Sequence, residues 1–279
     1  MKIKLKNLGV LKQAEFELGD LTIICGNNNT GKTYATYALF GFLDSWKKRI
    51  VFTIPDAIID QLISEGSISL NLLDYLTSYP EALAKACQDY SKNQSNIFDP
   101  KNLSNIFAAS VDKFKEADFQ IELLINESDV VGKNYESRIR SSGSITGIFA
   151  IQKSTESPDL IITILTEKTS INIQGEIIKE FINRAIIEII FGDCFPDTFI
   201  ASAERTGTAI FRKGLNFAYD RMLKELSISK VEKEIDPFEL LFKNYQNYPL
   251  PINVNIDFMS RLDSIAKQKS QLSEDSPNF

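Results

Sequence analysis

Apolar and polar residues alternate at the start of the chain. Residues 2–6 and 12–18 show this alternation, and the turn between them is too short for a crossover helix, so we expect an antiparallel pair of strands. The next apolar run, residues 21–25 (LTIIC), is continuous and contains β-branched side chains, as a fully buried parallel strand does. From Thr33 the apolar residues repeat at helical spacing, which predicts a helix that ends near Trp46.

Helical spacing continues through residues 51–117 and then changes to strand patterns. Three or four helices are expected there, in DAIIDQLI, LLDYLTSYPEALAKACQDYS and NLSNIFAASVDKFKEA. Residues 118–174 predict hairpins of an antiparallel sheet, in DFQIELLIN, SITGIFAIQK, DLIITILTE and TSINIQ. Beyond these we expect a helix that ends at Gly192, a short strand over residues 198–201, and a helix in DFMSRLDSIAKQK followed by a polar loop.

A phosphate-binding motif lies between the apolar run and the first helix. Gly26 is followed by four residues and then by Gly31, Lys32 and Thr33. In this pattern backbone N–H groups surround phosphates, the lysine reaches the β and γ oxygens, and the hydroxyl binds Mg²⁺. A plain Gly/Asn turn would not require the lysine and the hydroxyl. We therefore predict ATP and Mg²⁺ as ligands, with Lys32 as the catalytic residue and Thr33 as the metal ligand. The predicted nucleotide-binding residues are Gly26, Asn27, Asn28, Asn29, Thr30, Gly31, Lys32, Thr33 and Tyr34.

The interior of this motif resembles that of ATP-binding cassette ATPases, including the SMC and RecF-like ATPases. Asn28 occupies the asparagine position of the pattern G-x-N-x-x-G-K-[ST], and Asn29 stands where the family usually has glycine. The resemblance implies an α/β P-loop NTPase fold, an ABC-ATPase-like head with N-terminal antiparallel strands. It assigns residues 1–50 and 118–279 to the head and residues 51–117 to a helical insertion. The insertion either recognises a partner or closes over the sheet, and the turn at residues 6–12 is a candidate for holding the base.

A second motif follows the short strand predicted at residues 198–201. The sequence SAERTG resembles a strand-to-helix turn of bacterial cassette-type AAA-family ATPases, many of which belong to phage-defence or toxin-like modules. Glu204 and Arg205 lie at the end of a strand, where open α/β sheets bind ligands. They are candidates for a contact with nucleotide or with a dimer partner. The alternative is an ion pair that shapes the turn.

The acidic strand end that such ATPases need for Mg²⁺ and water is not evident. The segment most similar to such a strand end is residues 160–167, in which Thr166 stands in place of the metal-binding aspartate and Glu167 follows it. Residues 141–143 (SSG) have the position of a cassette signature, but the segment after them alternates like a strand instead of opening a helix. The order of motifs in the resembling family places both elements after residue 279. We therefore expect an N-terminal part of a longer ATPase that hydrolyses ATP poorly by itself.

The composition of the chain limits which activities, partners and locations are expected. The chain has no histidine, which excludes His-dependent nucleases, metallopeptidases and Ser-His-Asp hydrolases as activities of this polypeptide alone. Its net charge of −6 argues against a broad nucleic-acid surface. No apolar run is long enough for a membrane helix, and a cytoplasmic location is expected. The three cysteines have no metal-ligand spacing, so we expect buried thiols.

The resemblance also implies how such a protein works. Two heads enclose two ATP molecules, so a homodimer is expected whose formation ATP controls. In the complete ATPase this switch would act on an effector or partner subunit in bacterial phage defence. One alternative is a non-hydrolysing, nucleotide-dependent protein-interaction module. Another is a DNA-repair head of the SMC or RecF type, and the sequence leaves nucleic-acid binding open.

Overall fold

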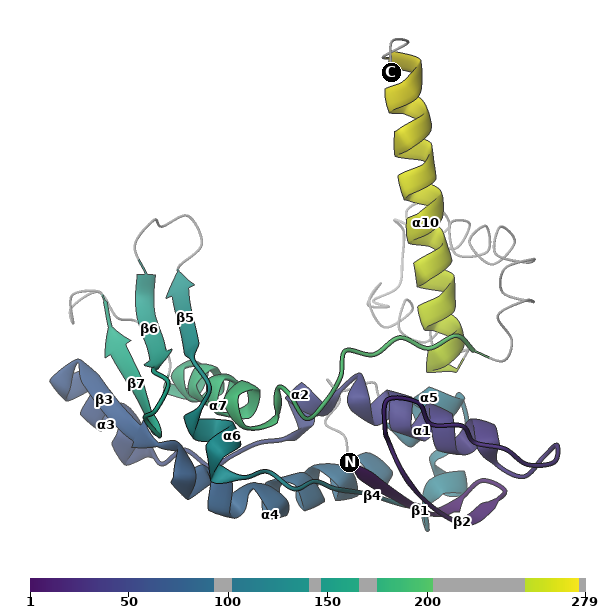
Figure 1. The fold of residues 1–279 in the computed structure, drawn as a ribbon, viewed down its shortest axis with the longest axis horizontal. Helices are drawn as coiled ribbons and strands as arrows, with labels where there is room; N and C mark the ends of the chain where they lie inside the picture. The colour runs from purple at the N-terminus through teal and green to yellow at the C-terminus, as the bar shows by residue number, and fades with distance from the viewer. Residues whose placement is uncertain (93–101, 141–146, 166–174, 203–248, 276–279) are drawn as a thin grey trace, which may run out of the picture.

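The fold is mixed α/β, with two sheets joined by one long helix. The computed structural model describes residues 1–92, 102–140, 147–165, 175–202 and 249–275. The two antiparallel sheets lie near opposite ends of helix α4 (Leu72–Ser91), and helix α10 (Leu250–Asp275) projects away from the rest (Figure 1). No helix in these ranges is long and apolar enough to cross a membrane.

The N-terminal sheet confirms the predicted antiparallel pair and adds a strand from far along the chain. Its order is β2-β1-β4, with β1 (Lys2–Leu8), β2 (Leu11–Glu17) and β4 (Asp118–Glu122). The sequence places β4 among the hairpins of residues 118–174, and this is wrong. β4 pairs with β1 because Phe119 and Ile121 bury their side chains in the same core as the inward face of β1.

A four-stranded antiparallel sheet lies near the other end of α4. Its order is β3-β7-β6-β5, with β3 (Ser67–Asn71), β7 (Asp159–Ile164), β6 (Gly147–Lys153) and β5 (Tyr135–Arg140). The predicted hairpin of β6 and β7 is confirmed. The sequence prediction missed β5, because YESRIR is short and has only two large apolar side chains, Tyr135 and Ile139, so its alternation is weak.

The segment 51–117 is not wholly helical, in contrast to the prediction. Strand β3 separates helix α3 (Asp56–Glu65) from α4, and its Ile68 and Leu70 are buried. β3 pairs with β7, so it joins this segment to a part of the chain beyond residue 117. Five residues with two apolar side chains are too short to interrupt a helical pattern visibly. The limits of the insertion as a domain stay a prediction.

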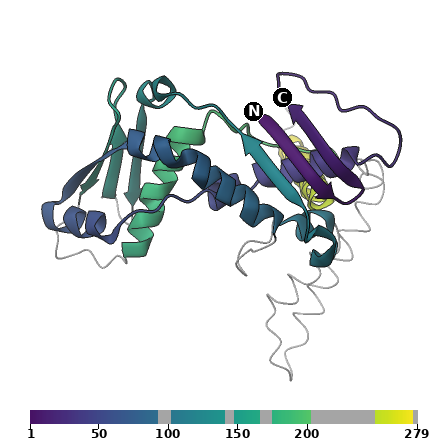
Figure 2. The same ribbon diagram turned by 90° about the horizontal axis from the view of Figure 1, so that it is seen from below.

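Helix α1 (Lys32–Leu43) lies in the core beside the N-terminal sheet and is buried along most of its length. It ends at Leu43 instead of near Trp46, because the backbone leaves helical geometry at Ser45 (φ −126°), whose N–H bonds to the carbonyl oxygen of Phe42 (3.0 Å). Phe42 packs against the rings of Tyr90 and Phe119. Figure 2 shows α4 running from the β4 side of this sheet toward the four-stranded sheet.

Several shorter helices complete the fold. They are α2 (Trp46–Arg49), α5 (Leu103–Phe107), the 3₁₀ helix η1 (Val111–Phe114) and α6 (Glu127–Val131). Helix α7 (Gly175–Phe191) confirms the predicted helix that stops at Gly192, and its apolar stripe is buried.

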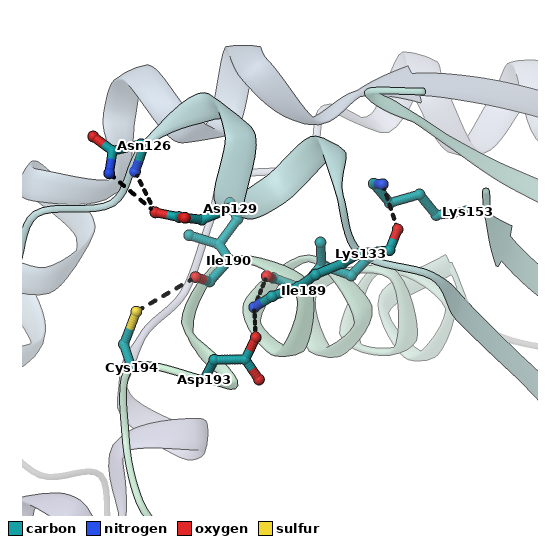
Figure 3. A network of polar contacts seen from close by, with 8 residues as sticks. All are labelled: Asn126, Asp129, Lys133, Lys153, Ile189, Ile190, Asp193 and Cys194. Carbon is teal, nitrogen blue, oxygen red and sulfur yellow. Dashed lines mark hydrogen bonds and ion pairs between the residues drawn. The ribbon is translucent and has the colours of Figure 1, made fainter. Parts of the chain in front are cut away.

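A buried lysine fastens the four-stranded sheet to α6. Lys153 is 1% exposed, and its Nζ donates to the carbonyl oxygens of Val131 (2.9 Å), Lys133 (2.6 Å) and Ser154 (3.1 Å). Burial lowers the pKa of Lys153, and the charge of Lys133 lowers it further. Lys133 in turn donates to Ile189 O (2.8 Å) and pairs with Asp193 (2.9 Å), so the network reaches the end of α7 (Figure 3).

Helix α10 begins earlier and ends later than predicted. It starts at Leu250 and includes most of the segment expected to be a polar loop. The side-chain amide of Asn255 accepts a hydrogen bond from the backbone N–H of Ser202 (3.2 Å) and donates one to the carbonyl of Ile200 (2.6 Å). The strand predicted over residues 198–201 is not formed, because its backbone bonds to this side chain and not to a neighbouring strand.

Candidate functional site

The five residues that lead into the phosphate-binding motif do not form the predicted buried strand. Residues 21–25 have no regular structure, and Leu21 and Ile23 are 80% and 73% exposed. Cys25 is exposed as well, so the predicted burial of all three thiols is wrong for this one. A strand is buried only where neighbours pair with its backbone and cover its faces. No strand in the described ranges pairs with this run, which explains its exposure.

The backbone of the motif bends as its residue types allow. Asn29 has φ 62° and Gly31 has φ 91°, both in the left-handed region. Asparagine tolerates this region better than other non-glycine residues, so its presence at the family's glycine position leaves the bend intact. The Thr30 hydroxyl donates to the carbonyl oxygen of Asn27 at 2.8 Å and closes the turn. Residues 26–30 are exposed and therefore accessible to a ligand.

Lys32 folds back over this loop. Its Nζ donates to the carbonyl oxygens of Gly26 (2.8 Å) and Asn27 (2.5 Å). Both acceptors are neutral, so the lysine charge is not cancelled by a carboxylate at this position. A phosphate that enters the loop would meet a positive charge, which forms stronger hydrogen bonds with an anion than with a carbonyl.

The N-terminus of α1 is open at the same point. Gly31 supplies no side-chain cap, and the first helical bond runs from Ala35 N–H to Gly31 O (3.0 Å). The preceding N–H groups of the first turn have no acceptor within the helix. This turn contains no acidic residue, so the positive end of the helix dipole is not neutralised there. Loop and helix together have the geometry that suits an anion.

Thr33, the predicted metal ligand, has an exposed side chain at the start of α1. Mg²⁺ takes oxygen ligands and is commonly shared between one or two protein groups and the phosphates of a substrate. The hydroxyl beside the anion site fits that arrangement. Within the described part of the chain, no group of three or more His, Cys, Asp or Glu side chains is placed to hold a metal ion.

Tyr34, the last of the predicted nucleotide-binding residues, is partly buried. Its ring stacks on that of Phe107 in α5, with centroids 4.8 Å apart, and it also meets Gly9 in the turn between β1 and β2. The turn at residues 6–12 therefore reaches the motif, and its contact with the base stays a prediction. The sequence does not single out Gly9 or Phe107, because neither is close to the motif along the chain.

The other candidate residues lie outside the described ranges. These are Glu204 and Arg205, together with Glu167 and residues 141–143. Their roles in nucleotide binding, dimer contact or hydrolysis stay predictions.

Comparison with known proteins identifies the family of the chain. A family model described as an AAA ATPase domain matches residues 1–277. No curated protein and no solved structure matches the chain. The family match covers nearly every residue and includes the phosphate-binding motif. The chain belongs to the AAA ATPase domain family, a family of ATP-binding P-loop ATPases.

Proposed function

We propose that this chain binds ATP with Mg²⁺ through the loop of residues 26–31, and that the bound nucleotide controls its association with a second copy and with a partner. The observation that carries the proposal is the position of Lys32. Its charge lies over an exposed loop at the uncapped end of α1, with no carboxylate in the first helical turn.

Each residue of the site has a distinct role in this proposal. Lys32 leaves the carbonyls of Gly26 and Asn27 and donates to the β and γ oxygens instead. The backbone N–H groups of residues 26–31 and of the first turn of α1 bind the remaining phosphate oxygens. Thr33 supplies an oxygen ligand for Mg²⁺, and the bound ion would neutralise charge on the phosphates during transfer to water.

The switch is proposed to act on an effector in bacterial phage defence. Family membership supports nucleotide control, and the exposed loop leaves the site open to a second copy. The charges on the outer face of the N-terminal sheet argue against a DNA-repair role. Its Lys2 and Lys4 pair with Glu15 and Glu122, so these lysines do not form an uncompensated basic surface for nucleic acid.

The test is ATP affinity and turnover of the full chain with MgCl₂, for wild type and Lys32→Ala. Lys48→Ala, which removes an exposed lysine in α2, is the control. We expect Lys32→Ala to raise the ATP dissociation constant by roughly tenfold to a hundredfold, as for loss of a hydrogen bond to a charged group. Thr33→Val should abolish the Mg²⁺ dependence of binding, whereas Thr33→Ser should retain it.

Unchanged ATP affinity in Lys32→Ala would refute the nucleotide site. Binding that depends on Lys32 without turnover would agree with the poor hydrolysis expected of this chain by itself, and would fit the non-hydrolysing interaction module equally well. The proposed role in phage defence has its own test. If cells carrying Lys32→Ala are still protected from phage, nucleotide binding does not control the defence.

A further inference from the structure

The turn between β1 and β2 packs against the phosphate-binding motif at two points. Gly9 has φ 61°, and a Cβ built there would lie 2.2 Å from Cε1 of Tyr34. A Cβ built at Gly31 would lie 3.0 Å from the Cβ of Leu11. Both distances are shorter than ordinary carbon contacts of about 3.5–4.0 Å. The turn and the first residues of α1 therefore fit together without spare room.

Helix α5 holds the Tyr34 ring as well. The ring of Phe107 stacks on it with an interplanar angle of 27°, and Phe107 stacks in turn on Phe114 with centroids 5.4 Å apart. Phe114 is buried, so this stack ends in the core. A ring fixed between a hairpin turn and a buried stack has little freedom to rotate.

This restraint acts on the residues that would contact the nucleotide. Tyr34 follows Lys32 and Thr33 directly, and all three belong to the first turn of α1. A helical turn is rigid, so holding one side chain also holds the direction of the neighbouring N–H groups. The other end of the loop has no such support, because Leu21, Ile23 and Cys25 are exposed and no described strand pairs with residues 21–25.

We propose that Tyr34 is a positioning residue of the nucleotide site. Clamped between Gly9 and Phe107, its ring holds the first turn of α1 in the orientation that presents the lysine and the threonine to phosphate and Mg²⁺. The inference rests on the proposed nucleotide-binding function. It assigns the effect to the ring and not to the hydroxyl, because the contacts with Gly9 and Phe107 are ring contacts.

The experiment measures the ATP dissociation constant by calorimetry in the full chain, and the melting temperature of the nucleotide-free protein. The variants are Tyr34→Ala, Tyr34→Phe, Gly9→Ala and the double change of Gly9→Ala with Tyr34→Ala. Gly19→Ala is the matched control, because a Cβ at Gly19 meets nothing within 4 Å. Lys32→Ala is measured beside them.

We expect Tyr34→Ala and Gly9→Ala each to weaken ATP binding by about tenfold, and Tyr34→Phe and Gly19→Ala to leave it unchanged. In the double variant the Gly9→Ala change should add little, since the ring that it displaces is already gone. A purely structural role would instead lower the melting temperature and leave the dissociation constant unchanged at 20 °C below it.

Wild-type affinity in Tyr34→Ala, beside lost binding in Lys32→Ala, would overturn the positioning role and leave the nucleotide site standing. Additive effects in the double variant would overturn it too, because Gly9 would then act independently of the ring. If Lys32→Ala itself binds ATP normally, the proposed function fails, and the positioning role fails with it.

Discussion

Strand β7 (DLIITI) and residues 21–25 (LTIIC) have nearly the same kinds of side chain and opposite surroundings. In β7, Leu160 and Ile162 are buried, and the backbone pairs with β3 on one side and β6 on the other. In residues 21–25, Leu21 and Ile23 are exposed, and no strand in the described part of the chain pairs with them. Whether such a run becomes a buried strand therefore depends on the strands beside it and not on its own residue types.

The comparison shows what strand propensity measures. Val, Ile and Thr favour strands because they fit a pleated, half-buried surface, and that surface exists only where other strands supply it. An unpaired apolar strand also leaves its backbone N–H and C=O groups open to pairing. The phosphate loop consequently has one end held by packed side chains at α1, whereas at the other end, residues 21–25, no described strand pairs with the backbone.

Thiol labelling gives the largest expected contrast. Cys25 is exposed, whereas Cys87 is 1% exposed and burial raises the pKa of its thiol to about 12. Thiolates are the reactive species, and a buried thiol reacts only when the structure opens. We expect Cys25 to react with a disulfide reagent at least roughly a thousandfold faster than Cys87. Cys25→Ser identifies the fast phase, and a slow Cys25 would show that the run is packed.

A matched pair of isoleucine changes tests the same comparison by stability. Ile162→Ala removes a fully buried side chain from β7 and should lower the free energy of unfolding by about 2–5 kcal/mol. Ile23→Ala removes an exposed one and should change it by no more than about 0.5 kcal/mol. Urea denaturation measures both. Equal losses would mean that residues 21–25 are buried in the folded protein.

A substitution at Lys153 tests how much its hydrogen bonds stabilise the four-stranded sheet. Lys153→Met leaves three carbonyl oxygens without their donor and should destabilise the protein by about 1–3 kcal/mol at pH 7, measured by urea denaturation. The charged lysine is itself disfavoured by burial, so its folded-state pKa is below the ordinary 10.5.

The pH dependence of this change has a defined sign. Between the lowered pKa and 10.5 the unfolded chain binds more protons than the folded protein, so folded-state stability rises with pH. The wild type should therefore gain stability relative to Lys153→Met as the pH increases through that window. A stability difference that stays constant with pH would contradict the buried, charged lysine.

The smallest expected effect concerns the junction of β3 and α4. The Asn71 side chain accepts a hydrogen bond from Leu73 N–H (2.9 Å) and caps α4. Asn71→Ala should cost about 1 kcal/mol in denaturation experiments, and Asn71→Ser should restore most of it. If both variants match the wild type, the cap does not stabilise this junction.

Several parts of the site and fold were predictable because their signals are local. The motif from Gly26 to Thr33 predicts a loop followed by a helix, and the structure has both. Alternation predicts the β1–β2 hairpin, and an apolar stripe predicts α7. In each case the residues that form the hydrogen bonds are neighbours in sequence or are joined by a short turn.

The predictions that were wrong concern features that depend on contacts with segments far along the chain. The partner of β4, the strand character of β3, and the exposure of residues 21–25 are set by which strands meet in space. Tyr34 directly follows the motif in the sequence, but its contacts come from Gly9 and Phe107, about 25 and 70 residues away by their numbering.

The sequence by itself determined the phosphate-binding chemistry and the helix that carries it, because both are set by residue types at fixed short spacing. Only the tertiary structure decided which apolar runs become paired strands and which elements hold the loop in place. Pairing and packing are interactions between distant segments, and a one-dimensional pattern records each segment without its neighbour.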